Sequence, residues 1–200
     1  MNTRRLLGAM LAAGAMAGCA VALPVVPSTR PVPVQPSTPV PPVATLSGVP
    51  LLAPMPGVYT SAQPGAGDWM RLPALGIATV INLRPRAEMP ARDEAAEVRD
   101  AGLAYIEIPV VGPAEVTPEN AHALWQALQR AQGKVLVHCS TGNRAGALMA
   151  LAAHANGMAS AEALALGKAA GLTRLDPVVR QRLGLPAMAC PAGSGTAATC

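Results

Sequence analysis

The stretch Val135-Leu-Val-His-Cys-Ser-Thr-Gly-Asn-Arg-Ala-Gly146 decides the fold of this 200-residue chain. Its first three residues are apolar, and with His138 they predict a buried strand that places Cys139 at its carboxyl end. A tight turn containing Gly142 follows, and an alanine-rich helix begins at about Arg144. In an open α/β sheet, ligands bind in the crevice outside the carboxyl ends of the strands. The stretch therefore predicts both an α/β sheet and the edge of that sheet where chemistry takes place.

The segments on both sides alternate between strand-like and helix-like patterns. Short β-rich runs predict strands over residues 77–83 and 103–108. Thr117 followed by Pro118 is typical of a helix start. The predicted helices cover residues 68–75, 88–101, 118–131 and 145–156, and two more begin at Ser160 and Asp176. This alternation predicts an α/β domain with a mainly parallel central sheet flanked by helices.

The turn after Cys139 combines groups suited to binding an oxyanion. The residues whose backbone N–H groups can point to a common centre are Ser140, Thr141, Gly142, Asn143 and Arg144. Gly142 tolerates the positive φ that such a turn needs. The Arg144 guanidinium can bind an oxyanion through two hydrogen bonds. The same positive field favours the thiolate form of Cys139, which is the nucleophilic form. We expect His138 to support the site by orientation and hydrogen bonding, not as a general base.

Four stretches together resemble a known family. They are VLVHCSTGNR, GVYTSAQP at residues 57–64, GIATVINLRP at residues 76–85, and residues 109–119. This set is similar to the cysteine-dependent protein tyrosine and dual-specificity phosphatases, and most of all to the bacterial phosphatase-like domain called beta-lactamase-hydrolase-like. The resemblance covers about residues 57–172. It implies a dual-specificity-phosphatase-like fold, a phosphorylated substrate, and a cysteinyl-phosphate intermediate formed on Cys139 with no metal or organic cofactor.

Three features depart from the family pattern. Four residues separate Cys139 from Arg144, where most of the superfamily has five; the beta-lactamase-hydrolase-like domain is also one residue short. The residue after the arginine is Ala145 instead of Ser or Thr. The aspartic general acid has no counterpart, so Glu115 is the first candidate for that role and Glu107 the second, with a solvated loop carboxylate as the alternative for Glu115. These departures predict a slow enzyme that cleaves mainly good leaving groups such as aryl phosphates.

Two other functions remain open at this level. The segment from Cys139 to Arg144 is also similar to the six-residue loop of rhodaneses, in which the cysteine carries a persulfide. A catalytically inactive module that binds an anion or a phosphoprotein is the other alternative. His138 and the 57–64 stretch favour the phosphatase interpretation.

The N-terminal segment predicts export and lipid anchoring. A basic start through Arg5 precedes 12 uncharged residues, too few for the about 20 that span a bilayer as a helix. Met16-Ala17-Gly18-Cys19 resembles a bacterial lipobox, so residues 1–18 are expected to be a lipoprotein signal peptide and Cys19 the lipidated residue. Ala20 favours the outer membrane in a diderm bacterium. We therefore expect a protein anchored in the cell envelope on the periplasmic side, with ordinary secretion as the alternative.

Composition suggests the remaining organisation. Residues 19–56 are rich in proline and predict an extended tether, residues 57–185 form the phosphatase-like domain, and residues 186–200 form a loose tail. Cys190 and Cys200 lie in that tail and are either disulfide-bonded or free.

The overall composition limits the possible functions. Apolar residues make up 51% of the chain, which favours a packed core. The chain has 15 basic and 11 acidic residues and no basic cluster, which argues against nucleic-acid binding. His122 and His154 have no partners at metal-ligand spacing, so we predict no metal site.

Overall fold

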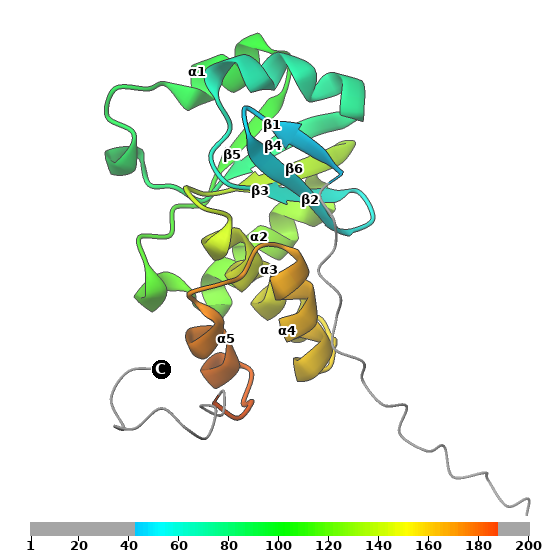
Figure 1. Cartoon of the computed structure of the whole chain (residues 1–200), viewed down its shortest axis with the longest axis vertical. Coiled ribbons are helices and arrows are strands. Elements are labelled where there is room, and N and C mark those ends of the chain that lie inside the picture. Colours follow the sequence, from blue (N-terminus) through cyan, green and yellow to red (C-terminus); the bar gives the residue numbers. More distant parts are fainter. Residues whose placement is uncertain (1–42, 188–200) are drawn as a thin grey trace, which may run out of the picture. The chain divides into compact units, whose positions relative to one another are not determined.

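The computed structural model describes residues 43–187, which form a six-stranded sheet with helices on both faces (Figure 1). The strands are β1 (Ala44–Leu46), β2 (Val49–Met55), β3 (Val58–Ser61), β4 (Ile77–Asn82), β5 (Ala104–Glu107) and β6 (Lys134–His138). Their order across the sheet is β1-β2-β3-β6-β4-β5. The strands β3, β6, β4 and β5 run parallel, while β1 and β2 pair antiparallel. The predicted α/β fold with a mainly parallel sheet is confirmed.

Within residues 43–187, five α-helices connect and cover the strands. They are α1 (Glu94–Asp100), α2 (Pro118–Arg130), α3 (Asn143–Ala155), α4 (Ser160–Ala169) and α5 (Asp176–Arg182). The predicted cap of α2 is confirmed, because the Thr117 hydroxyl accepts a hydrogen bond from the N–H of Asn120. The start of α1 was predicted six residues too early. Pro90 disfavours helix before it, and Asp93 supplies the actual cap by accepting from the N–H of Ala96.

Short 3₁₀ helices replace part of the predicted helical structure. Where one helix was expected at residues 68–75, the chain forms η1 (Ala66–Arg71) and η2 (Pro73–Leu75), because Pro73 interrupts a continuous helix. Two more lie in loops at the carboxyl side of the sheet, η3 (Arg86–Glu88) and η4 (Pro113–Glu115). The last two prove important for the candidate active site.

The predicted tether is wrong in its last third. Residues 44–55 form β1 and β2, whose side chains Leu46 and Leu51 are buried in the core. Pro54 is accommodated where the register between β2 and β3 shifts, a position that does not require its missing N–H.

Several predictions concern residues outside the described part of the chain. They are the signal peptide, Cys19, the rest of the tether, and the cysteines at 190 and 200. Within residues 43–187, no helix has the length and apolarity needed to span a membrane.

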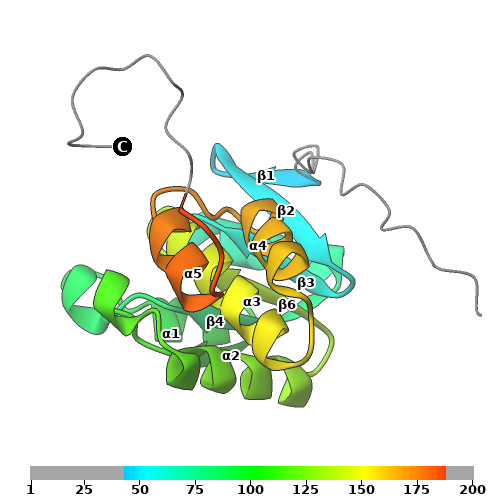
Figure 2. The same ribbon diagram turned by 90° about the horizontal axis from the view of Figure 1, so that it is seen from below.

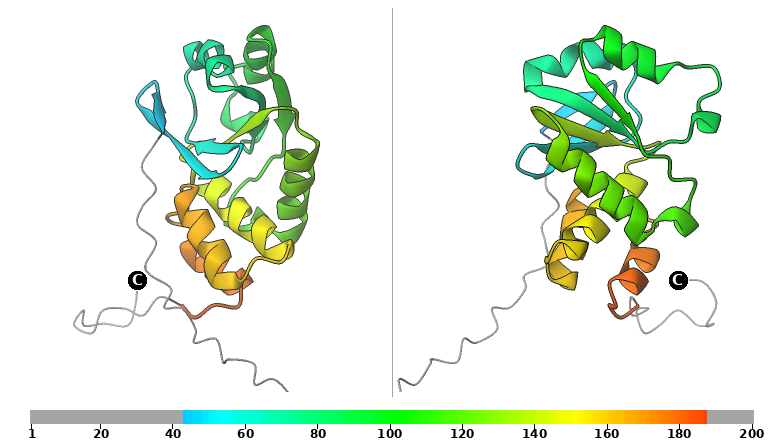
Figure 3. Two further views of the ribbon diagram at one scale, coloured as in Figure 1. Left: turned by 90° about the vertical axis from the view of Figure 1, so that its right-hand side faces the viewer. Right: turned by 180° about the vertical axis from the view of Figure 1, so that it is seen from behind.

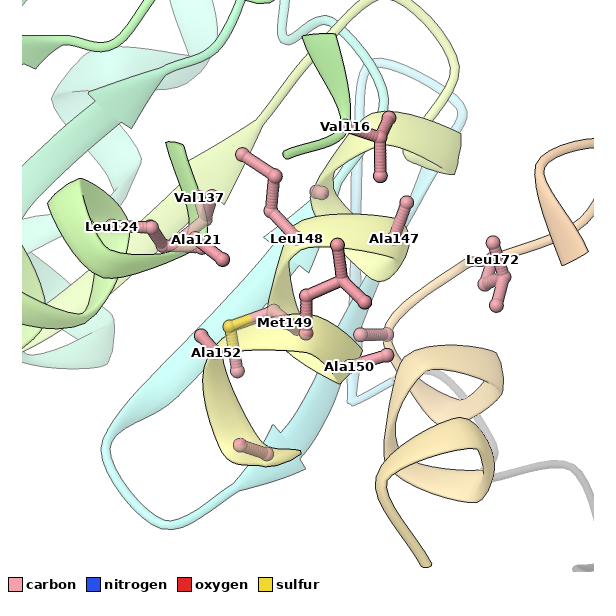
Figure 4. Packing of buried hydrophobic residues seen from close by; sticks show 14 of the residues in the cluster. Val116, Ala121, Leu124, Val137, Ala147, Leu148, Met149, Ala150, Ala152 and Leu172 are labelled. Carbon is pink, nitrogen blue, oxygen red and sulfur yellow. The ribbon is translucent and has the colours of Figure 1, made fainter. Parts of the chain in front are cut away.

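The sheet separates two hydrophobic clusters. One side is covered by α1 and the η1–η2 segment, and the other by α2, α3, α4 and α5 (Figures 1 and 2). Views from the side and from behind show the same two layers against the sheet (Figure 3). The helix α3 is central, with nine of its 13 residues buried. Its side chains Leu148 and Ala150 lie among those of α2, β6 and Leu172 (Figure 4).

Two glycines allow α3 and α4 to touch backbone to backbone. A Cβ on Gly146 would lie 2.2 Å from the N atom of Leu172 and 2.6 Å from the carbonyl oxygen of Gly167. A Cβ on Gly167 would lie 2.8 Å from the carbonyl oxygen of Gly146. This close approach brings the segment after α4 directly against the first turn of α3, which is where the candidate active site lies.

Candidate active site

Cys139 follows the last residue of β6, at the carboxyl end of the parallel strands. Because β6 lies between β3 and β4, the cysteine is flanked by the ends of both neighbours. Cys139 is buried, and its thiol forms no disulfide within the described part of the chain. The predicted position at a strand tip is therefore confirmed, and the sulfur lies at the base of the loop that follows.

The loop after Cys139 has the geometry of an anion-binding turn. Gly142 adopts the left-handed conformation at φ 82° and caps α3, which begins at Asn143. The N–H groups of Ser140, Thr141 and Gly142 donate no hydrogen bond to any residue in the described part of the chain. Asn143 and Arg144 occupy the first turn of α3, where backbone N–H groups have no helical acceptor. These unpaired donors at a helix N-terminus favour a bound anion.

The Arg144 guanidinium folds back over this loop. Its Nη1 and Nη2 atoms each donate to a carboxylate oxygen of Glu88, both at 2.7 Å. Nη1 also donates to the carbonyl of Val110 at 2.6 Å, and Nη2 to the hydroxyl of Ser140 at 3.2 Å. The hydrogen bonds to Glu88, followed by the charge of the nearby Cys139, raise the pKa of Arg144 despite its partial burial. The Nε–H donates to no oxygen atom among residues 43–187, and the guanidinium also lies within hydrogen-bonding reach of the Cys139 thiol.

Glu88 is a site residue that the sequence analysis missed. It lies in η3, six residues beyond the end of β4, and also accepts a hydrogen bond from Nε of Arg84 at 3.1 Å. The hydrogen bond to Arg144 is the main cause that lowers the pKa of Glu88, so this group is a carboxylate at neutral pH. The available signal was its place in the loop after β4, at the same sheet edge as Cys139.

The two glutamates predicted as general acids lie in different places. Glu115 ends η4, is half-buried, and accepts a hydrogen bond from the N–H of Val111. This loop is tied to the site, because the carbonyl of the preceding Val110 binds Arg144. Glu107 is exposed at the end of β5, and β4 separates it from β6. The structure therefore brings the Glu115 loop to the site and leaves Glu107 outside it.

His138 is completely buried beside a second carboxylate that sequence analysis missed. Its Nε2 lies 3.0 Å from Oε1 of Glu94, whose side chain is 1% exposed. Burial alone would raise the pKa of Glu94, but contacts with His138 and Gln63 outweigh burial and lower it. The Trp69 ring packs on His138 with centroids 5.8 Å apart. His138 therefore lies directly before Cys139 with its ring packed between Glu94 and Trp69, and its supporting role stays a prediction.

Gln63 connects the two carboxylates. Its side-chain amide donates to Oε2 of Glu94, and its carbonyl oxygen accepts from Nη1 of Arg84 at 2.7 Å. A continuous chain of polar contacts therefore runs through His138, Glu94, Gln63, Arg84, Glu88 and Arg144. This chain begins at the residue before Cys139 and ends at Arg144, so it connects the two ends of the loop.

Asn143 fastens the loop to the segment after α4. Its Oδ1 accepts hydrogen bonds from the N–H of Thr173 at 2.8 Å and of Leu175 at 3.2 Å. Asn143 was predicted only as a backbone donor to an anion, and its side chain proves to have this second structural role. Among residues 43–187, no group of three or more His, Cys, Asp or Glu side chains is placed to hold a metal ion.

The site combines three features that define a phosphatase-like domain. They are a parallel strand, an N–H-lined turn with Cys139 at its base, and an arginine at the start of the next helix. The chain belongs to the family of the beta-lactamase hydrolase-like protein, phosphatase-like domain, whose model matches residues 55–156. A beta-lactamase hydrolase-like protein of Xylella fastidiosa is 39% identical over 116 residues, which are 56% of this chain. The corresponding Agrobacterium fabrum protein is 36% identical over 89 residues, or 42% of this chain.

Solved structures support the same class. A candidate phosphatase from Neisseria meningitidis is 26% identical, with a TM-score of 0.57 over 66% of this chain and 94% of that chain. A variant of TpbA from P. aeruginosa, in complex with phosphotyrosine, shares the fold with a TM-score of 0.52 and 22% identity, over 74% of this chain and 98% of that chain. The matches to the curated relatives span only 27% and 20% of the lengths of the Xylella and Agrobacterium proteins.

Proposed function

We propose that this protein is a cysteine-dependent phosphatase that hydrolyses phosphate monoesters, either protein phosphotyrosine or small aryl phosphates. The observation that carries the proposal is the union of Cys139, a turn of unpaired N–H groups and the Arg144 guanidinium at one sheet edge. Electrostatic stabilisation of the transferring phosphoryl group by such donors is the main source of catalysis in this reaction class.

The reaction has two displacements. The thiolate of Cys139 attacks phosphorus in line with the leaving group, so that a P–S bond forms and the ester P–O bond breaks. The leaving oxygen takes a proton from Glu115. Water then attacks the phosphorus of the cysteinyl phosphate, the P–S bond breaks, and Glu115 takes a proton from that water. The products are inorganic phosphate, the free alcohol and the regenerated thiolate.

Glu88 is a positioning residue in this scheme. It occupies the Nη1 and Nη2 edge of Arg144, which leaves the Nε–H and the Nη2–H now shared with Ser140 for two phosphate oxygens. Its lowered pKa makes it a poor proton donor, which supports assigning the acid role to Glu115 on the neighbouring loop.

The proposed rate is slow. Ala145 has no hydroxyl to assist the departure of the thiolate, and residues 107–115 contain no aspartate to serve as the general acid. General acid–base help is worth about 10²–10⁴ in rate, so a poorly placed acid restricts turnover to good leaving groups.

Sulfur transfer is the second candidate. The number of residues between Cys139 and Arg144 is that of the rhodanese loop, and the beta-lactamase-hydrolase-like domain shares this short spacing, so the loop length fits both reactions. In this reaction, Cys139 takes the outer sulfur of thiosulfate as a persulfide and releases sulfite; cyanide then accepts that sulfur as thiocyanate.

One paired assay separates these functions. The purified protein is given p-nitrophenyl phosphate in one arm and thiosulfate with cyanide in the other, with Cys139→Ser as the control in both. Release of p-nitrophenol by the wild type alone supports the proposal. Thiocyanate without p-nitrophenol supports sulfur transfer and contradicts it. Neither product, with thermal stabilisation by phosphate or sulfate, supports an inactive anion-binding module.

We also propose that Cys19 carries a lipid anchor in the bacterial cell envelope, on the basis of the Met16–Cys19 motif. Dual acylation would give a stable attachment. Incorporation of labelled fatty acid and recovery in the membrane fraction are expected for the wild type and not for Cys19→Ala. A wild-type protein recovered in the soluble fraction without label contradicts the anchor.

A further inference from the structure

Gln63 lies two residues after the end of β3, in a segment that packs against the anion-binding turn. Its N–H donates to the carbonyl oxygen of Ser140 at 3.4 Å. One residue pair further along, a Cβ on Gly142 would lie 3.6 Å from the carbonyl oxygen of Ser61. The backbone of Gln63 is therefore placed directly beside the turn, and its side chain extends from that position to other groups.

The side-chain amide of Gln63 donates and accepts hydrogen bonds at the same time. Its Nε2 donates to Oε2 of Glu94 and to the carbonyl oxygen of Pro64. Its Oε1 accepts from Nη1 of Arg84 at 2.7 Å. An amide carries a donor and an acceptor on one planar group, so it can bind a carboxylate and a guanidinium together. A carboxylate in its place has no proton for Glu94, and an apolar side chain binds neither neighbour.

Arg84 contacts the rest of the site through Gln63. Within residues 43–187, the hydrogen bonds of the Arg84 side chain go only to Glu88, four residues along the same loop, and to Gln63. The carboxylate of Glu88 in turn binds only Arg84 and Arg144 in that part of the chain. Gln63 is therefore the side chain that fixes the Arg84–Glu88 pair, and with it the guanidinium of Arg144, to the segment beside the turn.

Position 63 is surrounded by charged and titratable side chains. They are Glu94 and Arg84 in direct contact, His138 and Glu88 one contact further, and Arg92 with its partner Glu97 beside Pro64. Glu94 is the group that an acidic side chain at position 63 would meet. Two carboxyl groups that share a site do not ionise together, so one of them keeps its proton to a higher pH. A carboxyl group introduced at this position can thus be switched by pH, whereas the natural amide cannot.

We infer that Gln63 is a positioning residue of the active site, whose amide holds Arg84 and, through Arg84 and Glu88, sets the orientation in which Arg144 binds an anion. The inference rests on the proposed function, in which Arg144 binds the phosphoryl oxygens. Substitutions within networks of contacts change binding by about two- to thirtyfold. Loss of the Gln63 amide should therefore weaken anion binding although no group that touches the anion is removed.

The test measures sulfate binding to the full-length Cys139→Ser variant by calorimetry at pH 5 and at pH 8. Sulfate is tetrahedral and stays a dianion at both pH values, and the serine removes the titration of the thiol. Adding Gln63→Met should raise the dissociation constant about three- to tenfold at both pH values. Adding Gln63→Glu should raise it equally at pH 8. At pH 5 the increase should be less than about twofold, because the shared proton restores a donor to Glu94 and leaves an acceptor for Arg84.

Two further variants control for other causes. Gln129→Glu adds the same charge at an exposed position near the end of α2, which precedes β6 at the opposite end from Cys139, and should leave sulfate binding unchanged. Combining Gln63→Met with Glu88→Gln tests the route. If Gln63 acts through Glu88, the combined loss of affinity should be no larger than the larger single loss, whereas independent effects would multiply.

Every other result overturns the inference. Such results are an unchanged affinity in Gln63→Met, a pH-independent loss in Gln63→Glu, an equal loss in Gln129→Glu, multiplied losses in the combined variant, and no sulfate binding by the background protein. A Gln63→Met protein that does not fold assigns Gln63 to the fold and overturns it as well. The measurement requires no turnover. A protein whose sulfate affinity depends on Gln63 in the expected way, but which hydrolyses no p-nitrophenyl phosphate with Cys139 present, contradicts the proposed function alone.

Discussion

His138, directly before Cys139, and Arg144, at the end of the loop after it, each contact a glutamate. The two pairs differ in how far they are exposed to solvent. The Arg144–Glu88 pair reaches the surface, with 11% and 31% of the side chains exposed. The His138–Glu94 pair is 0% and 1% exposed. An exposed pair can exchange partners at little cost, whereas a buried pair cannot lose one member without leaving an unpaired polar group in the core. The arginine side of the loop is thus suited to binding a ligand, and the histidine side to holding the loop in place.

The largest effect is expected from removing the buried carboxylate. Glu94→Ala should lower the free energy of unfolding by about 3–5 kcal/mol, because His138 and Gln63 lose their shared partner inside the protein. Urea unfolding followed by tryptophan fluorescence measures this change. The comparison of the two pairs fails if Glu88→Ala, at the exposed pair, costs as much.

The next largest effect concerns activity. Arg144→Lys should lower kcat/KM for p-nitrophenyl phosphate by about 10²–10³-fold, because a lysine has no planar fork to bind two phosphate oxygens. Its unfolding free energy should change by less than about 1 kcal/mol. Steady-state kinetics and urea unfolding of the same preparation check both statements. Full activity in this variant would show that the guanidinium does not contact the transferring group.

A smaller loss is expected when the exposed pair is weakened but not removed. Glu88→Gln keeps the shape of the side chain and loses the charge that orients Arg144, so kcat/KM should fall about tenfold through misplacement of the guanidinium. Stability should stay within about 1 kcal/mol of the wild type. The reverse result, a stability loss without a kinetic one, would assign Glu88 to the fold instead of the site.

The smallest effect is a dependence of stability on acid. The pKa of Glu94 is lowered in the folded protein from an ordinary value of 4.5, so folding favours its ionised form. This contribution to stability is present above pH 4.5 and is lost as pH falls below it. Between pH 7 and pH 3, the melting temperature of the wild type should fall more than that of Glu94→Gln. Parallel curves for the two proteins would contradict this contribution.

Local sequence predicted those parts of the site that depend on neighbouring residues. The turn at Gly142, the helix that begins beside Arg144 and the Thr117 cap were all predictable, because φ preferences and capping act over a few residues. The carboxylates were not. Glu94 and Gln63 are 31 residues apart, and Glu88 and Arg144 are 56 apart, so no local pattern indicates that they meet. The predicted tether failed similarly, because its prolines concealed the apolar residues Leu46 and Leu51 that pack into the core.

The sequence by itself determined that Cys139 follows a buried strand and precedes a turn of free N–H groups, since backbone conformation depends on the residues next to it. Only the tertiary structure decided which acidic groups stand on either side of that cysteine, which loops form the walls of the site, and which arginines bind those acidic groups. Electrostatic partners are selected by distance in space, and those distances exist only once the strands have paired and the helices have packed.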